Sequence, residues 1–219
     1  MKIVASLTDP GDAPAASAAG ADLIELRLDL MGGDLVKGVQ ECRKRSGLPV
    51  IATLRSAPEG GNYSGNGDEW FRVIGPVIPF VDYIDVERRF SAHAEAIRAH
   101  DVTIIASCHM TGMPSLFELF GLERELQVYG DIPKIVVLPR HDEDIIEMIS
   151  FTHAAKKPVC TGVMGPRFRY ARLILPLFGS EFVYCHVGSP TAEGQYSVAE
   201  VKAAMELFGA EKFGTEKHQ

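Results

Sequence analysis

The chain has 219 residues, of which 46% are hydrophobic, and a formal net charge of −7 at pH 7. This length and apolar content suit one compact domain with a full core, which we expect to span residues 1–219. The acidic balance, without any block of lysine or arginine, argues against a nucleic-acid partner, because phosphates need a basic surface, and it favours an enzyme of small molecules.

Short runs rich in valine and isoleucine predict eight strands along the chain. They lie at residues 3–7, 23–28, 50–54, 81–86, 102–108, 135–138, 159–163 and 182–187. Apolar residues at helical spacing predict helices between them, at 35–45, 70–78, 116–129, 144–155 and 198–208. This alternation is typical of parallel strands joined by right-handed crossovers.

Two α/β architectures have this alternation, a (β/α)8 TIM barrel and an open doubly wound sheet. The open dinucleotide-binding sheet usually has a G-x-G-x-x-G turn after its first strand, but residues 8–12 read Thr-Asp-Pro-Gly-Asp. Eight strand–helix units in a chain of this length favour the barrel. We expect the last residues, 215–219, to form a frayed tail.

Charged and apolar side chains alternate in the second predicted strand. A period of two places Glu25, Arg27 and Asp29 on one face and three aliphatic residues on the other. Because the aliphatic face must pack under the helices, the ionic face turns into the barrel, where unpaired charge is costly. A functional site and an internal salt-bridge network both account for such burial.

Further polar side chains follow the next three strands. Arg55 ends the third strand, Asp85 and Glu87 end the fourth, and His109 follows the fifth. Barrel enzymes assemble their active sites at this carboxyl end of the strands. Histidine is the side chain best suited to exchange protons near neutral pH, although a lone histidine is often structural.

The sixth predicted strand region carries a lysine, Lys134, next to an apolar run. Lysine is rarely buried without a functional reason. Desolvation beside cationic groups such as Arg27 and Arg55 would leave part of it as free amine, the form that attacks a ketone. The alternative is a lysine that caps the start of the strand and extends to the lower rim.

Two later segments suit ligand binding. Residues 164–172 open a helix and carry Arg167, Arg169 and Arg172, of which only some can face a site. A helix start with arginine suits a carboxylate or phosphate, and it would attract an anion locally despite the net negative charge. The loops at 188–195 and 56–67 could close over a ligand or be ordinary connections.

The cysteines and the apolar segments bear on where the protein resides in the cell. Cys42, Cys108, Cys160 and Cys185 are far apart, form no C-x-x-C pair and have no histidine at metal-ligand spacing, so we expect neither a zinc site nor disulfides. The first apolar stretch is too short for a secretory signal, and no later one approaches the roughly 18–20 apolar residues of a membrane span. We therefore expect a cytoplasmic protein without membrane contact.

Several motifs occur together, in order, along nearly the whole chain. They are Glu25-Leu26-Arg27-Leu28-Asp29, Thr53-Leu54-Arg55 with Glu59-Gly60-Gly61, Ile84-Asp85-Val86-Glu87, Ser107-Cys108-His109, Ile132-Pro133-Lys134 and Gly194-Gln195. In this combination the sequence resembles the type I 3-dehydroquinate dehydratases (3-dehydroquinases), the Schiff-base-forming class.

The resemblance implies a (β/α)8 barrel that removes water from 3-dehydroquinate by syn elimination, giving 3-dehydroshikimate on the shikimate route to aromatic amino acids. It implies no cofactor, no metal, and a homodimer. Lys134 would form the Schiff base, His109 would be the general base and acid, and Glu59 and Asp85 would orient His109 and tune its basicity. The implied substrate-binding residues are Arg172 for the carboxylate and Ser6, Glu25, Arg27, Arg55, Thr191 and Gln195 for the rest of the molecule.

A departure in one loop and two alternatives accompany this resemblance, and the chain is also short for the family. Residues 191–195 read Thr-Ala-Glu-Gly-Gln where the family commonly has Ser-Ala-Pro-Gly-Gln, which affects loop closure and affinity. A class I aldolase barrel is one alternative, but its phosphate would want glycine-rich turns after strands seven and eight, whereas arginines, Thr191 and Gln195 stand there. The other alternative is a non-catalytic barrel that binds a small acid.

Overall fold

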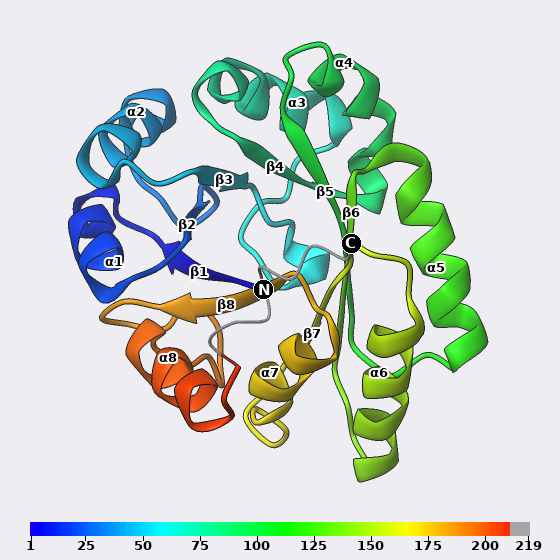
Figure 1. The fold of residues 1–219 in the computed structure, drawn as a ribbon. Coiled ribbons are helices and arrows are strands. Elements are labelled where there is room, and N and C mark those ends of the chain that lie inside the picture. The colour runs from blue at the N-terminus through cyan, green and yellow to red at the C-terminus, as the bar shows by residue number, and fades with distance from the viewer. Residues whose placement is uncertain (211–219) are drawn as a thin grey trace, which may run out of the picture.

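A computed structural model describes residues 1–210, so the expected tail at 215–219 and the end of the expected domain lie outside the described residues. Eight strands surround a central axis, with helices on the outside (Figure 1). The strands are β1 (Lys2–Leu7), β2 (Leu23–Arg27), β3 (Val50–Thr53), β4 (Tyr83–Glu87), β5 (Thr103–Met110), β6 (Ile132–Val137), β7 (Cys160–Val163) and β8 (Phe182–His186). All paired strands are parallel, in the order β7-β6-β5-β4-β3-β2-β1-β8, which confirms the predicted (β/α)8 barrel.

The seam between β7 and β8 closes through a few contacts instead of a full ladder. An isolated bridge joins Val159 to Ser180, and the amide of Glu181 donates to the carbonyl of Val159 at 2.8 Å. The hydroxyl of Ser180 accepts from the amide of Thr161 at 2.9 Å and donates to the carbonyl of Thr161 at 3.2 Å. A serine side chain therefore supplies hydrogen bonds that a neighbouring strand supplies elsewhere in the barrel.

Eight α-helices cover the described part of the barrel. They are α1 (Ala13–Ala19), α2 (Leu35–Ser46), α3 (Gly67–Ile74), α4 (Ala94–Arg98), α5 (Leu116–Tyr129), α6 (Asp142–Ala154), α7 (Ala171–Ile174) and α8 (Val198–Leu207). The five predicted helices are present, and α1, α4 and α7 are additional. Predicted helix 70–78 ends at Ile74 as an α-helix and continues as a 3-10 helix, because prolines at 76 and 79 cannot donate the backbone hydrogen bonds of an α-helix. None of the helices in residues 1–210 is both long and apolar enough to cross a bilayer.

Two strands differ from the predicted ranges in a way that bears on the site. β4 begins at Tyr83 and not at Val81, because the chain leaves a 3-10 helix at Val81. β6 begins at Ile132, so Lys134 lies inside the strand, and this residue is only 4% exposed. The alternative that Lys134 caps the strand and reaches the lower rim is therefore wrong.

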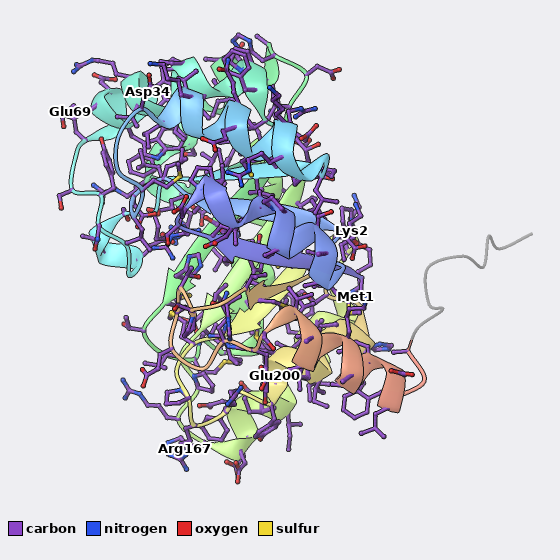
Figure 2. The ribbon with its side chains drawn as sticks, turned by 90° about the vertical axis from the view of Figure 1, so that its left-hand side faces the viewer. Met1, Lys2, Asp34, Glu69, Arg167 and Glu200 are labelled. Carbon is purple, nitrogen blue, oxygen red and sulfur yellow. The ribbon has the colours of Figure 1, made fainter. Side chains whose placement is uncertain are left out.

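The interior of the barrel is apolar at the amino-terminal end and polar above it. The apolar end is one cluster formed by Val4, Leu23, Ile51, Ile105, Ile132, Cys160 and Phe182. Since side chains two positions further along a strand point to the same side, the next layer contains polar groups such as Ser6, Glu25 and Lys134. Figure 2 shows the barrel from the side, with Lys2 at the amino-terminal end and Asp34, Glu69 and Arg167, which follow strand ends, on the opposite side.

Candidate active site

A cavity of about 420 Å³ occupies the carboxyl end of the barrel. Ten of the eleven predicted site residues line it: Ser6, Glu25, Arg27, Arg55, Glu59, His109, Lys134, Arg172, Thr191 and Gln195. The eleventh, Asp85, is buried beside the cavity at 2% exposure. The ionic face of β2 therefore points into a cavity at the end of the barrel where active sites form.

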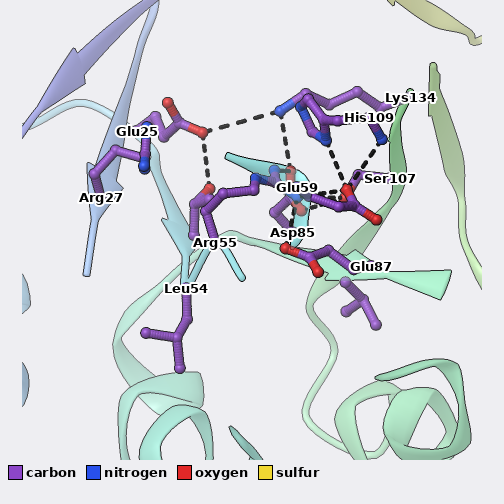
Figure 3. Close-up of polar contacts among 12 residues, drawn as sticks. Glu25, Arg27, Leu54, Arg55, Glu59, Asp85, Glu87, Ser107, His109 and Lys134 are labelled. Carbon is purple, nitrogen blue, oxygen red and sulfur yellow. Dashed lines mark hydrogen bonds and ion pairs between the residues drawn. The ribbon is translucent and has the colours of Figure 1, made fainter. Parts of the chain in front are cut away.

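Lys134 lies deep in this cavity, between two carboxylates (Figure 3). Its Nζ donates to Oδ2 of Asp85 at 3.0 Å and lies 4.0 Å from Oε1 of Glu25. The charged groups that contact the amine are thus anionic, whereas the sequence suggested Arg27 and Arg55 as neighbours. Those two arginines have ion pairs of their own, so the lysine belongs to a wider ionic network.

Arg55 is the centre of that network. Its Nη2 donates to Asp85 at 2.8 Å, and its Nη1 donates to Glu87 and to the hydroxyl of Ser107, each at 3.0 Å. Ser107 in turn donates to Oδ1 of Asp85 at 2.5 Å. Burial by itself would raise the pKa of Asp85, but the charges of Arg55 and Lys134 outweigh burial and hold this pKa well below its ordinary value. Asp85 is therefore a carboxylate at neutral pH.

His109 pairs with Glu59 and not with Asp85. Its Nδ1 lies 2.8 Å from Oε2 of Glu59, and its backbone amide donates to the same oxygen at 3.0 Å. The expectation that Asp85 also orients His109 is wrong, because the hydrogen bonds of Asp85 go to Lys134, Arg55 and Ser107. The negative charge of Asp85 nevertheless raises the pKa of His109 against the larger effect of burial, which agrees with the expectation that Asp85 tunes the basicity of this histidine.

The surroundings of the His109–Glu59 pair favour a neutral imidazole. Burial, followed by the positive charges of Arg55 and Lys134, lowers the pKa of His109 well below its ordinary value. Burial and the nearby charge of Glu87 raise the pKa of Glu59 to about 7. With Nδ1 engaged by the Glu59 carboxylate, Nε2 is the ring nitrogen that is left to accept a proton.

A tight turn after β3 brings Glu59 to His109. Ser56 is anchored by its amide and hydroxyl, which donate to the carboxylate of Glu87 at 2.8 and 2.5 Å. The amide of Gly61 donates back to the carbonyl of Ser56 at 2.8 Å. A Cβ atom at Gly61 would overlap the carbonyl oxygen of Arg55, so only glycine fits this close approach. The Glu-Gly-Gly sequence thus has a geometric reason.

Internal partners also hold the polar side chains of β2. Arg27 forms a bidentate pair with Asp29 at 2.9 and 2.8 Å. Glu25 accepts hydrogen bonds from the hydroxyls of Ser6 at 2.6 Å and Thr53 at 2.8 Å. The internal network expected of this ionic face is therefore present, while its side chains also line the cavity and their functional role stays a prediction.

Only one of the three arginines at 167–172 lines the cavity, and it is Arg172. Its Nη2 donates to the backbone carbonyl of Glu193 at 3.2 Å, while its buried Nε has no hydrogen-bond partner among the described residues. Burial lowers the pKa of Arg172. In contrast, Arg169 stacks on the ring of Tyr196 at 3.8 Å, and Arg167 is exposed. Arg172 therefore has donor capacity left for an anion.

The loop after β8 is tied to the barrel by Gln195. The side-chain oxygen of Gln195 accepts from the amide and hydroxyl of Thr191 at 2.9 and 3.1 Å, and its nitrogen donates to the carbonyl of Cys185 at 3.1 Å. Gly194 has a φ of 77°. A Cβ there would lie 2.6 Å from the carbonyl oxygen of Gly165, so the loops after β7 and β8 pack closely.

The sequence did not single out two residues that the structure brings to the site. Ser107 joins Arg55 to Asp85, and Tyr184 on β8 lines the cavity beside Lys134. The alternation of residues 182–186 places Phe182, Tyr184 and His186 on one face, which was a usable signal for the tyrosine. In residues 1–210, no group of three or more His, Cys, Asp or Glu side chains is arranged to hold a metal ion.

The barrel and its polar cavity define a small-molecule enzyme of the (β/α)8 class. The family model described as type I 3-dehydroquinase matches residues 7–212. A 3-dehydroquinate dehydratase of Methanoregula boonei is 58% identical over 207 residues, which cover 94% of this chain and 99% of the relative. That of Methanospirillum hungatei is 39% identical, covering 94% and 81% of the two chains. The chain belongs to the type I 3-dehydroquinase family.

Solved structures agree with this family. The crystal structure of the 3-dehydroquinate dehydratase from Aquifex aeolicus has a TM-score of 0.84 at 26% sequence identity and covers 95% of this chain and 99% of its own. The enzyme from Geobacillus kaustophilus has a TM-score of 0.88 at 24% identity, covering 96% and 92% of the two chains. This second likeness shows the fold alone, which is again the eight-stranded barrel.

Proposed function

We propose that this chain dehydrates 3-dehydroquinate to 3-dehydroshikimate on the shikimate route to aromatic amino acids, through a Schiff base on Lys134. The observation that carries the mechanism is a lysine, 4% exposed, whose amine lies in the same cavity as a neutral histidine. Family membership supplies the reaction. The described cavity needs no further group for this chemistry, because an amine and a base carry every step.

The first step joins the amine to the ketone. The lone pair of Nζ attacks the carbonyl carbon, the resulting carbinolamine loses one water, and a protonated imine forms. This cation draws electrons from the adjacent carbon and makes its hydrogen acidic. Asp85, which contacts Nζ at 3.0 Å, accepts a hydrogen bond from the nitrogen during these changes.

His109 moves the proton in the second step. Its Nε2 removes the acidic hydrogen, and the electron pair enters the C–N bond to give a neutral enamine. The enamine then expels the hydroxyl of the next carbon, which takes a proton from the imidazolium of His109 and leaves as water. Water hydrolyses the product imine and frees Lys134. One imidazole that serves as base and then acid suits a syn elimination, and the net change is the loss of one water.

The remaining side chains suit a cyclic hydroxy acid. Arg172, with its unpaired buried Nε, would bind the carboxylate. Ser6, Glu25, Arg27, Arg55, Thr191 and Gln195 line the rest of the cavity and would contact hydroxyl groups. Because both terminal nitrogens of Arg55 already bond to protein groups, its main part would be to orient Asp85 and Glu87. The aldolase alternative and the non-catalytic alternative both conflict with the family to which the chain belongs.

Borohydride reduction tests the mechanism. Reduction in the presence of 3-dehydroquinate should attach the ligand irreversibly to Lys134, as peptide mass mapping would reveal. The Lys134→Met variant should give no adduct, whereas His109→Ala should still form the adduct but turn over about 10² to 10⁴ times more slowly. Active wild-type protein without an adduct on Lys134 would falsify the Schiff base.

We also propose a cytoplasmic homodimer. The four cysteines are buried and unpaired, which agrees with a reducing compartment. Phe117 and Val128 on α5 are 80% and 78% exposed, and eleven residues of helix bring both to the same face. We take these two exposed apolar side chains as the place where a second subunit would cover the helix.

A further inference from the structure

Tyr184 presents the face of its ring to the reactive amine. The Nζ atom of Lys134 lies 4.0 Å from the ring centroid, and both residues line the cavity. The ring of Phe182 packs edge-on against it, at 6.3 Å between centroids and an angle of 86°, which holds the ring in this orientation. The hydroxyl oxygen of Tyr184 is buried and has no hydrogen-bond partner in the described part of the chain.

Ionisable groups from four other strands and from the turn after β3 face this contact. Asp85 on β4 and Glu25 on β2 contact the amine directly, at 3.0 and 4.0 Å. Arg55 after β3, His109 on β5 and Cys160 on β7 act on the same region through their charges or polarity. The ring of Tyr184 is the aromatic contact of the amine, and it completes the shell on the β8 side.

Formation of the imine changes what these groups can do. An ammonium group has three N–H donors, whereas a protonated imine has one, so the cation can keep only one strong hydrogen bond to a carboxylate. A ring face needs no N–H group, because it attracts the positive charge through its quadrupole. The neutral imine gains nothing from this attraction. The ring therefore favours the protonated imine, the form that withdraws electrons from the adjacent carbon.

We propose that Tyr184 is a catalytic residue of this enzyme, whose ring face stabilises the protonated imine on Lys134. The inference rests on the proposed Schiff base and adds a residue to it. Burial raises the pKa of Tyr184 well above its ordinary value, so the side chain stays uncharged over the working pH range. The ring, and not the hydroxyl group, carries this role, because it is the ring that contacts the nitrogen.

The test measures how the imine holds its proton. Wild type, Tyr184→Phe and Tyr184→Leu are reduced with borohydride in the presence of 3-dehydroquinate across a series of pH values, and the adduct on Lys134 is quantified. In wild type the adduct should decline at alkaline pH, as the imine loses its proton. Tyr184→Phe keeps the ring and should follow wild type. Tyr184→Leu should decline about 0.4 to 1.5 pH units earlier, and its kcat should fall more than its KM rises.

A second series guards against a misfolded leucine variant. Phenylalanine with one, two or three ring fluorines, incorporated at position 184, keeps the shape of the ring while weakening its quadrupole. The alkaline decline should move to lower pH in steps with the number of fluorines. An unchanged decline along this series, or an equal shift in Tyr184→Phe and Tyr184→Leu, overturns the role of the ring face. Absence of an adduct in active wild type would instead overturn the Schiff base itself.

Discussion

At the scale of single residues, the site holds its lysine and its histidine in two separate pairs, each with its own carboxylate. Lys134 is paired with Asp85, and His109 is paired with Glu59. Arg55 stands between the two pairs, 2.8 Å from Asp85 and 3.4 Å from Glu59. Its positive charge keeps Asp85 ionised and disfavours an imidazolium at His109. One buried guanidinium thus sets the protonation of both pairs.

The pH dependence of activity should follow Glu59, whose pKa is raised to about 7. Above that pH the Glu59 carboxylate accepts the Nδ1 proton of His109, and Nε2 is free to act as base. As pH falls through about 7, Glu59 takes up a proton and donates to Nδ1, so the ring proton moves to Nε2 and the base is lost. We therefore expect kcat/KM to decrease by up to about tenfold per pH unit below this point.

The matching variants separate this role from a general change in charge. Glu59→Gln should lower kcat/KM by about 10² or more and remove the inflection near neutral pH, since no group is left to ionise at Nδ1. Glu147→Gln, on the exposed side of α6, changes the net charge equally and should keep both the rate and the profile. If the inflection of the pH profile persists in Glu59→Gln, a titratable group other than Glu59 must cause it.

At the scale of elements, alternation along β2 was enough to predict that Glu25 and Arg27 face the interior, and both line the cavity. The partners of these side chains could not be predicted, because they depend on which residues of neighbouring strands lie at the same level. Thr53 is in register with Arg27, yet its hydroxyl reaches Glu25. Such cross-strand geometry follows from the tilt and stagger of a closed barrel and leaves no pattern in one sequence.

Three helices were missed for reasons that are also local. α1 contains mostly alanine and buries only Ala13 and Ala16, so it has no stripe of large apolar residues. α4 and α7 have five and four residues, which is too short for a helical period to repeat. The longer helices were predicted within a few residues, since their apolar faces pack on the barrel. The fold was therefore more predictable than the contacts within the site.

The turn after β3 links an element to the chemistry, and Gly61→Ala tests that link. The added methyl group would overlap the carbonyl of Arg55, so the turn must shift and carry Glu59 away from His109. We expect a loss of about 1–3 kcal/mol in the free energy of unfolding, and a decrease in kcat of about 10²-fold from misplacement of the pair. Gly32→Ala meets no atom within 4 Å and should change neither quantity. Denaturant titration and steady-state kinetics measure the two effects, and an unaltered kcat in Gly61→Ala would disconnect the turn from catalysis.

At the scale of the whole molecule, the net charge and the cavity act in opposite directions on an acidic substrate. A charge of −7 repels an anion at a distance, where salt screens the interaction. Within the cavity, Arg172 is half-buried and its buried Nε is unpaired among the described residues, so its attraction is local and less screened. Binding must therefore depend on short-range contacts with the side chains that line the cavity.

The outer face of α5 is where the proposed dimer can be tested. Phe117 and Val128 are on one side of this helix, three turns apart, and a subunit that covers them would remove both from water. Wild-type protein should have the mass of two chains by light scattering at micromolar concentration. Phe117→Glu should shift the mass toward one chain, because a buried unpaired carboxylate opposes association.

A control variant is available at the end of α8. Leu207 is 83% exposed, similar to Phe117, and Leu207→Glu should leave the dimer intact. A wild-type mass of one chain would exclude the dimer. A dimer that survives Phe117→Glu would move the interface away from α5.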